Sequence, residues 1–208
     1  MPSFKRYALL LAASLGTFLA SLDISIVNVA LPSIQHALGS DMAGLQWVVS
    51  TYAICLSALM LCAGPLGDRL GHKLTWLSSN AVFGAGSLMC AAATDLTCLL
   101  IGRAIQGIAG AGLIPGALPL ITHAFSVPME RAHAIGCWSV CSALALVVGH
   151  LLGGLMSHAF GWPSIFLINL PIVLLARATL RKYSKKPSFS ARGIRHHVVY
   201  PLANSSIS

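Results

Sequence analysis

The sequence predicts an all-α integral membrane protein that crosses the bilayer six times. Hydrophobic residues make up 56% of the chain, charged residues make up only 9%, and the mean hydropathy is +0.80. Soluble domains carry about a quarter charged residues, so this composition excludes most soluble folds. Two further observations support a membrane protein: the spacing of the apolar stretches, and the one-sided distribution of lysine and arginine.

Six stretches approach the roughly 20 apolar residues that a membrane-spanning helix needs. The first continues past Asp23 to Pro32, which is too long for the core of a cleaved secretory signal, so we expect it to remain as a helix. The sixth is the weakest, because Pro171 lies inside it and Arg177 lies near its end. The expected helices cover residues 7–31, 47–62, 74–93, 99–121, 134–158 and 164–179.

The basic residues indicate the orientation of these helices. Twelve of the 13 lysines and arginines lie at the N-terminus, in the second-to-third and fourth-to-fifth connections, and in the C-terminal segment. The other connections, 32–46, 94–98 and 159–163, carry none. Because short cytoplasmic loops are enriched in basic residues, both ends are predicted to lie in the cytoplasm. The net charge of +8 therefore belongs to a cytoplasmic rim and does not indicate a nucleic-acid partner.

The predicted domain organisation is a membrane bundle over residues 1–180 and a basic, disordered cytoplasmic tail over residues 181–208. Such a tail can also be attracted to anionic lipid. Helices four and five are rich in glycine and proline, which suits either tight packing or sliding of helices in lipid. The segment Ala30–Ile34 is echoed by Ala117–Ile121, which hints at two inverted repeats of three helices.

Apart from Arg177 near the end of the sixth, two charges remain inside the predicted spans. At about 1.5 Å per residue, Arg103 lies roughly 6 Å and Asp23 roughly 12 Å below the outer surface, so the two can meet if helices one and four are neighbours. An ionisable group at such depth is by default a functional hypothesis. Two alternatives remain open: Arg103 can snorkel to the headgroups, and a neutral Asp23 can hydrogen-bond to Ser25 or Asn28.

The segment Gly64–Lys73 reads GPLGDRLGHK. It resembles the signature loop of the major facilitator superfamily and departs from it only at His72, where that family has Arg or Lys. The resemblance implies that this loop latches two six-helix halves together on the inner face. The implied loop residues are Gly64, Gly67, Asp68, Arg69, Gly71 and Lys73.

Three further motifs follow in the family's order. Leu22–Pro32 is similar to the helix-one motif of the drug:proton antiporter branch, and Gln46–Val49 with Tyr52 is similar to helix two of its fourteen-helix subgroup. Arg103–Gly107 resembles the helix-four motif R-x-x-Q-G. The resemblance implies proton coupling by Asp23 and Arg103, driven by a proton gradient without a cofactor. It also implies a substrate cavity lined by Asn28, Trp47, Tyr52 and Gln106.

Two departures from the family pattern matter. The helix-five motif reads Gly149-His150-Leu151-Leu152-Gly153-Gly154, with His150 in place of a proline, so antiport and other modes of coupling both stay open. Gly149, Gly153 and Gly154 are expected to pack helix five. The resemblance ends near Leu175, after six of twelve or fourteen helices, and the tail is unlike the expected apolar continuation. A frameshift or a truncation would produce such a tail.

The expected function is proton-coupled efflux of drugs or other lipophilic small molecules by a half-length chain in a bacterial inner membrane. Membrane lipid, a small-molecule substrate and a second half, either a homodimer or a separate chain, are the expected partners. The alternative is a truncated, inactive relic or a non-transporting subunit. An enzyme is not expected, since no nucleophile–base set, zinc spacing or phosphate loop is present. Cys137 and Cys141 share a helix face without a further ligand cluster, so no metal or disulfide is assigned.

Overall fold

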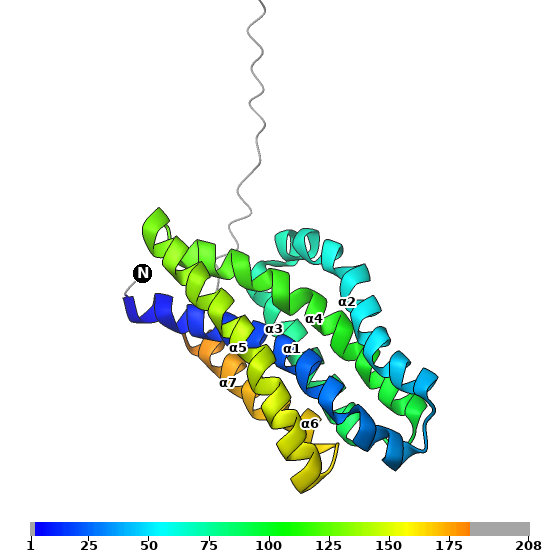
Figure 1. Cartoon of the computed structure of the whole chain (residues 1–208). Helices are drawn as coiled ribbons and strands as arrows, with labels where there is room; N and C mark the ends of the chain where they lie inside the picture. Colours follow the sequence, from blue (N-terminus) through cyan, green and yellow to red (C-terminus); the bar gives the residue numbers. More distant parts are fainter. Residues whose placement is uncertain (1–2, 184–208) are drawn as a thin grey trace, which may run out of the picture.

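The structure is a computed structural model that describes residues 3–183, and the predicted tail over 181–208 lies almost wholly outside the described residues. Within this range the chain forms a bundle of long helices and no strand (Figure 1). The helices are α1 (Ser3–Leu38), α2 (Met42–Leu70), α3 (His72–Ala91), α4 (Leu96–Ala124), α5 (Pro128–Phe160), α6 (Ser164–Leu167) and α7 (Asn169–Tyr183).

The predicted six-helix membrane bundle is confirmed. Five helices of the described part are long and apolar enough to cross a bilayer: α1, α2, α4, α5 and the combined α6–α7 segment. The sixth, α3, has 20 residues, which corresponds to about 30 Å of helix. It is less apolar because Ser78, Ser79, Asn80 and Ser87 lie along it. It packs against α4 and α7, and Asn80 and Ser87 are buried there, while Ser79 is partly buried and Ser78 is exposed.

Several helix boundaries differ from the sequence prediction. Helix α1 continues to Leu38 with Pro32 inside it, and α2 continues to Leu70 with Pro65 inside it. Prolines in membrane helices are tolerated where neighbouring helices and local adjustments satisfy the freed backbone groups. Hydropathy marks only the part of a helix that lies in hydrocarbon, so it underestimates helices whose ends extend into the interface.

The packing order supports two related repeats of three helices. Helix α1 packs against α5 and α7, just as α4 packs against α2 and α3. Exchanging the first three spans with the last three therefore reproduces the main contacts. The echoed sequence segments agree, because Ala30 and Ile34 on α1 and their counterparts Ala117 and Ile121 on α4 are all buried.

The basic segments gather at one end of the bundle. In Figure 1 the N-terminus and the α2–α3 and α4–α5 connections lie at the upper end, while the α1–α2 and α5–α6 connections lie at the lower end. We call the upper end the basic end, because it carries Lys5, Arg6, Lys73 and Arg131. Arg6 joins α1 to α5 there through an ion pair with Glu130 at 2.5 Å. This arrangement fits the orientation predicted from lysine and arginine.

Glycines allow the closest helix contacts. A Cβ atom at Gly149 would lie 3.0 Å from the carbonyl oxygen of Leu22, and one at Gly153 would lie 2.9 Å from that of Ile26, so α5 approaches the backbone of α1 directly. Gly154 differs, because its nearest neighbour, a Val29 methyl group, would lie 3.8 Å away. Of the three glycines in the helix-five motif, two therefore lie where a side chain would not fit.

Two apolar clusters form the interior. The basic-end cluster includes Trp76, Phe83 and Leu113, and the opposite cluster includes Ile34, Leu99 and Phe166. Fully buried polar side chains occupy the level between them. This polar layer consists of Asp23, Ser87, Arg103, Gln106 and Asn169.

Candidate functional site

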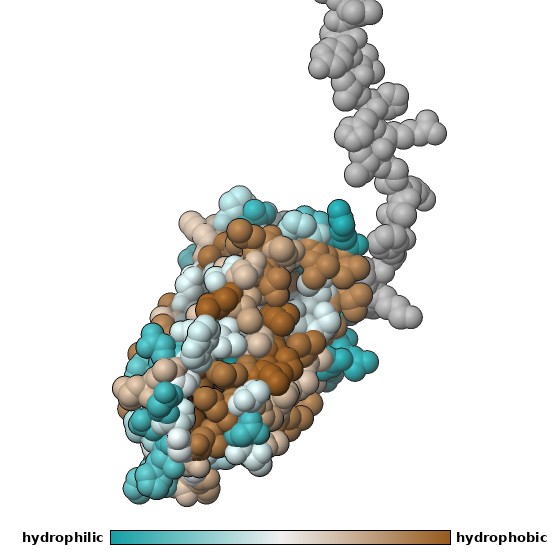
Figure 2. All heavy atoms as spheres, turned by 90° about the vertical axis from the view of Figure 1, so that its right-hand side faces the viewer, coloured by the Kyte–Doolittle hydropathy of each residue, from teal (hydrophilic) through white to brown (hydrophobic). Residues whose placement is uncertain are grey.

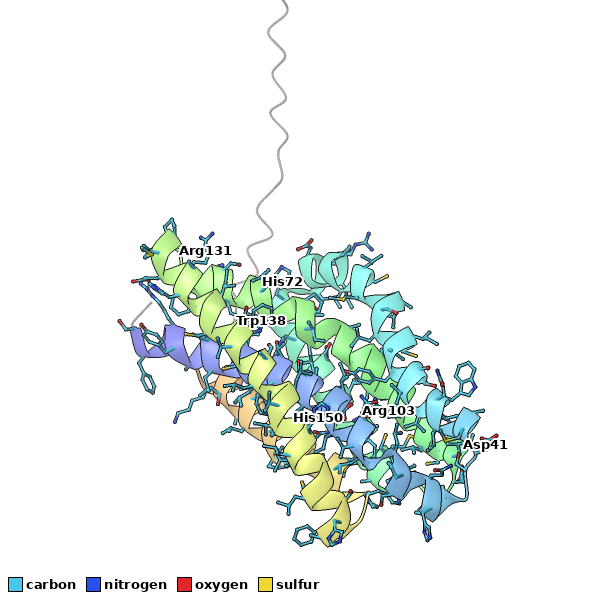
Figure 3. The ribbon with its side chains drawn as sticks, in the orientation of Figure 1. Asp41, His72, Arg103, Arg131, Trp138 and His150 are labelled. Carbon is cyan, nitrogen blue, oxygen red and sulfur yellow. The ribbon has the colours of Figure 1, made fainter. Side chains whose placement is uncertain are left out.

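The centre of the polar layer is an ion pair between α1 and α4. Arg103 donates from Nη1 to Oδ2 of Asp23, and the two side chains are 1% and 0% exposed. The predicted meeting of this acid and this base between the first and fourth spans is confirmed. In Figure 3, Arg103 lies between His72, at the basic end, and Asp41, at the opposite end of the bundle.

The two alternative roles do not match the observed contacts. Arg103 is 1% exposed, and its guanidinium group bonds Asp23 and Gln106 inside the bundle instead of extending outward. The Ser25 hydroxyl donates to the carbonyl of Leu146 at 2.6 Å, and the Asn28 amide donates to the carbonyl of Ile24 at 2.8 Å. Neither of these side chains is therefore hydrogen-bonded to Asp23.

Two further side chains hydrogen-bond to Asp23, and a third bonds both of them. Oδ1 of Asp23 accepts hydrogen bonds from Gln106 Nε2 at 3.1 Å and from Asn169 Nδ2 at 3.0 Å. The same two amides donate to Ser87 Oγ, at 2.9 and 3.2 Å. The carboxylate thus faces three donors, and an ionised carboxylate only accepts. A buried ion pair is tolerated only when additional hydrogen bonds satisfy its remaining atoms in this way.

Arg103 is held on its other sides as well. Its Nε donates to the carbonyl of Val48 at 3.1 Å and its Nη1 to Gln106 Oε1 at 2.9 Å. The guanidinium carbon lies 4.4 Å from the centre of the Tyr52 ring, a cation–π distance. If the ion pair opens, three other contacts therefore remain to position the cation.

The helix-four motif explains how these groups come together. Residues three and four apart share a helix face, so Arg103, Gln106, Gly107 and Gly110 lie on one side of α4. The glycines make room for α2: a Cβ atom at Gly110 would lie 3.0 Å from the Tyr52 hydroxyl, and one at Gly107 would lie 2.8 Å from Cβ of Cys55. The small residues therefore bring the Tyr52 ring against the guanidinium group.

A pocket of about 300 Å³ adjoins the ion pair and contains both Tyr52 and Arg103 in its wall. The other lining residues are Ile24, Val27, Val49, Ala53, Leu56 and Ser57. A second pocket of about 470 Å³ lies between α1 and α2 and includes Asn28 and Gln46. Val49 lines both pockets, so they are neighbours along α2.

The four expected cavity-lining residues have different surroundings. Tyr52 and Asn28 each line one of these pockets, while Gln106 is 0% exposed and belongs to the polar layer. Trp47 is 56% exposed and lines neither of the two. Sequence reasoning missed Ser87 and Asn169. A usable signal existed, because each is a polar residue inside a predicted apolar span.

The signature segment differs from the expected loop. Gly64 to Leu70 are the last turns of α2, and α3 begins at His72, so only Gly71 lies between the helices. Gly71 has φ +90°, a conformation that glycine adopts readily. His72, the residue that departs from the family pattern, places Nε2 3.2 Å from Oδ1 of Asp68. The Asp68 side chain remains 74% exposed and accessible from the basic end.

His150, which occupies the family's proline position, joins α5 to α1. Its Nδ1 lies 2.6 Å from Ser25 Oγ and 2.8 Å from the carbonyl oxygen of Leu146. Within residues 3–183 no three His, Cys, Asp or Glu side chains lie close enough together to hold a metal ion. The six cysteines, all of them in this range, are free thiols.

Fold and site together define a multi-pass membrane protein built around a buried ion pair. The Major Facilitator Superfamily model matches residues 13–203. The chain therefore belongs to the major facilitator superfamily, a family of membrane transporters and not of enzymes. The match extends beyond Leu175, where the resemblance recognised from motifs ends.

Curated relatives include resistance and export proteins. The chain is 35% identical to the methylenomycin A resistance protein of Streptomyces coelicolor, covering 95% of this chain and 42% of the relative. It is 37% identical to the multidrug resistance protein Stp of Mycobacterium tuberculosis, covering 78% and 30%. It is 32% identical to the riboflavin transporter RibZ of Clostridioides difficile, covering 88% and 40%. The chain thus spans less than half the length of these relatives.

A solved structure supports the fold. A bacterial homologue of the human lysosomal transporter Spinster, in an inward-facing and unoccupied conformation, superposes with a TM-score of 0.76 and 22% identity. The superposition covers 90% of this chain and 44% of the other. At this identity the similarity concerns the fold alone.

Proposed function

We propose that this chain forms the N-terminal half of a proton-coupled exporter of lipophilic small molecules in a bacterial inner membrane. The single observation that carries the proposal is the Asp23–Arg103 ion pair, buried at the middle level of the bundle beside an apolar pocket. Ionisable groups inside membrane spans mark ion pathways and proton relays. The resistance proteins among the relatives support a drug-like substrate.

In the proposed mechanism Asp23 is the group that accepts and releases the proton. A proton on its carboxyl group ends the ion pair, and the charge of Arg103 is then no longer compensated. An uncompensated buried charge is costly. The cation keeps its contacts to Val48, Gln106 and Tyr52, so its charge stays beside the pocket.

The pocket gives this charge a role in release. Its wall is apolar apart from Arg103, Ser57 and the hydroxyl of Tyr52, which suits a lipophilic molecule. When Asp23 is ionised, the pair is neutral and the pocket tolerates a cationic substrate. When Asp23 is protonated, the net positive charge of Arg103 repels that substrate. Proton uptake and release of a lipophilic cation are thereby coupled through one residue pair.

A second six-helix unit is the expected partner. Helices α2 and α5 bury few residues, and α2 exposes apolar side chains along its length. Figure 2 shows apolar atoms gathered on the side of the bundle that carries α2. The exposed apolar residues of α2 include Ile54, Leu59, Met60, Leu61 and Leu66. We propose that a second copy or a separately encoded half packs here, while other faces contact lipid.

The test is proton-driven efflux by the full chain. Purified protein, alone and mixed with a candidate second half, is reconstituted into vesicles, and ethidium movement is followed under an imposed pH gradient. Asp23→Asn should abolish the gradient-dependent component without affecting insertion. Asp41→Asn is the control, because it keeps the side-chain oxygen that caps α2. Unchanged efflux in Asp23→Asn would remove this residue from the mechanism.

The alternative is an inactive relic or a non-transporting subunit. It predicts that no assembly, neither the homodimer nor a mixture with a second half, moves ethidium under a pH gradient. Cross-linking through a cysteine introduced at Leu61, which is 86% exposed, in a variant whose six native cysteines are replaced by alanine, reports whether a partner packs on α2. A monomer that shows neither cross-linking nor efflux would favour the alternative.

A further inference from the structure

The interior between the polar layer and the basic end contains polar atoms without partners. Asn80 is 0% exposed, and neither its Nδ2 nor its Oδ1 is hydrogen-bonded to any described protein atom. The same holds for Nε1 of Trp76, which is also 0% exposed, and for Oδ1 of Asn169. Buried polar groups in native proteins are nearly always hydrogen-bonded, to protein or to ordered water.

Neighbouring contacts place these atoms in one column. On α7, Asn169 bonds Ser87, and Arg177 donates to the carbonyl of Leu77 at 3.0 Å. These two contacts bracket Asn80 on α3. At about 1.5 Å per residue, Asn80 lies about 10 Å from Ser87 toward the basic end, and Trp76 lies about 6 Å further.

Small buried residues surround this column. A Cβ atom at Gly16 of α1 or Gly112 of α4 would collide with Trp76 or Ser79, so both helices lie close to α3. Ala176 of α7 belongs to the same apolar cluster as Trp76 and Phe83 and is 0% exposed. A larger residue, Phe83, lies on the same face of α3 between Asn80 and Ser87. Any chain of water molecules along this column has to pass beside its ring.

Among residues 3–183, the side of the polar layer away from the basic end has no such set of unpartnered buried polar atoms. There the buried hydroxyl of Ser164 donates to the carbonyl of Gly161 at 2.6 Å, and Ser25 has its bond to Leu146. The buried side-chain polar atoms without partners among residues 3–183 lie instead in Thr75, Trp76 and Asn80 on α3 and in Asn169.

We propose that ordered waters bridge Trp76, Asn80 and Asn169 and form a hydrated route that connects the Asp23 layer to the solution at the basic end. About 10 Å between Asn80 and Ser87 corresponds to roughly three waters at hydrogen-bond spacing of about 2.8 Å. The route gives Asp23 proton exchange with the cytoplasm inside one bundle. The role of this route in proton exchange rests on the proposed function of Asp23, whereas the presence of water along it does not.

The first test uses hydroxyl radicals produced by X-ray irradiation of the purified chain, since radicals formed from bound water oxidise adjacent side chains. Trp76 and Phe83 should be oxidised at rates within a fewfold of exposed Trp47. Phe166 is the internal control, because it is equally buried but belongs to the opposite apolar cluster. Protection of Trp76 and Phe83 equal to that of Phe166 would overturn the proposal.

The second test measures magnetisation transfer from water to the Gln106 side-chain amide by NMR. Asn80→Leu should reduce this transfer severalfold, because an apolar side chain of similar size removes the polar groups and also fills the space midway along the route. Asn80→Ala, which leaves space for water, should retain it. Ser78→Ala is the matched control, since the Ser78 hydroxyl on the same helix already bonds the carbonyl of Thr75.

The outcomes separate this proposal from the proposed function. Unchanged transfer to Gln106 in Asn80→Leu would mean that the polar layer meets water elsewhere, and the route would be wrong. Neither test measures efflux. Efflux that survives Asp23→Asn would therefore refute the coupling role of Asp23, while radical labelling and water transfer would still decide whether the route holds water.

Discussion

The two apolar clusters on either side of the polar layer differ in how they treat polar atoms. The cluster opposite the basic end, around Leu99 and Phe166, leaves no buried side-chain polar atom without a partner among the described residues. The basic-end cluster, around Trp76 and Phe83, encloses the unpartnered amide of Asn80. The proposed hydrated route accounts for this difference: one side of the bundle seals Asp23, and the other side admits water.

The largest expected effect comes from breaking the polar layer that separates the two clusters. Arg103→Met leaves the Asp23 carboxylate buried without its cation, which should cost about 3–5 kcal/mol in free energy of unfolding. Unfolding in mixed detergent micelles, followed by circular dichroism, measures this loss.

The double variant Asp23→Leu/Arg103→Met provides the control. It should recover most of the lost stability, because no unpaired charge remains. Additive losses in the double variant would show that the two residues do not act as a pair.

An intermediate effect should distinguish the two clusters directly. Phe166→Ala opens a cavity in a fully apolar region and should cost about 3 kcal/mol or more. Phe83→Ala opens a cavity beside Asn80, where water can enter and bind the amide, so its cost should be smaller. The same unfolding assay compares the two variants, and equal losses would contradict a hydrated basic-end interior.

The smallest effect concerns the contact of α5 with α1. Gly149→Ala introduces a Cβ atom 3.0 Å from the Leu22 carbonyl oxygen and should destabilise the bundle by about 1–3 kcal/mol. Gly154→Ala, on the same helix but with its nearest neighbour at 3.8 Å, should be nearly neutral. Helix propensity favours alanine at both positions, so a cost at Gly154 equal to that at Gly149 would show that the close approach of α5 to α1 does not decide the result.

Much of the site could be predicted because hydrocarbon penalises polar side chains. Asp23 and Arg103 were recognisable as charges within apolar stretches, and the motif R-x-x-Q-G marked Gln106 as well. Ser87 and Asn169 are polar residues within predicted spans, but they carry no charge and match no motif, so the groups that they contact became visible only in the folded bundle. The signature segment was predicted as a loop, because glycines and charges obscure helical turns that continue to Leu70.

The sequence by itself determined the class of protein, the number of spans and their orientation, because burial in lipid and the placement of basic residues act locally along the chain. The tertiary structure decided which polar groups meet. Asn169 and Asp23 are 146 positions apart and bond at 3.0 Å. Such a contact depends on the rotation and height of each helix, and these are set by packing at glycines and not by hydropathy.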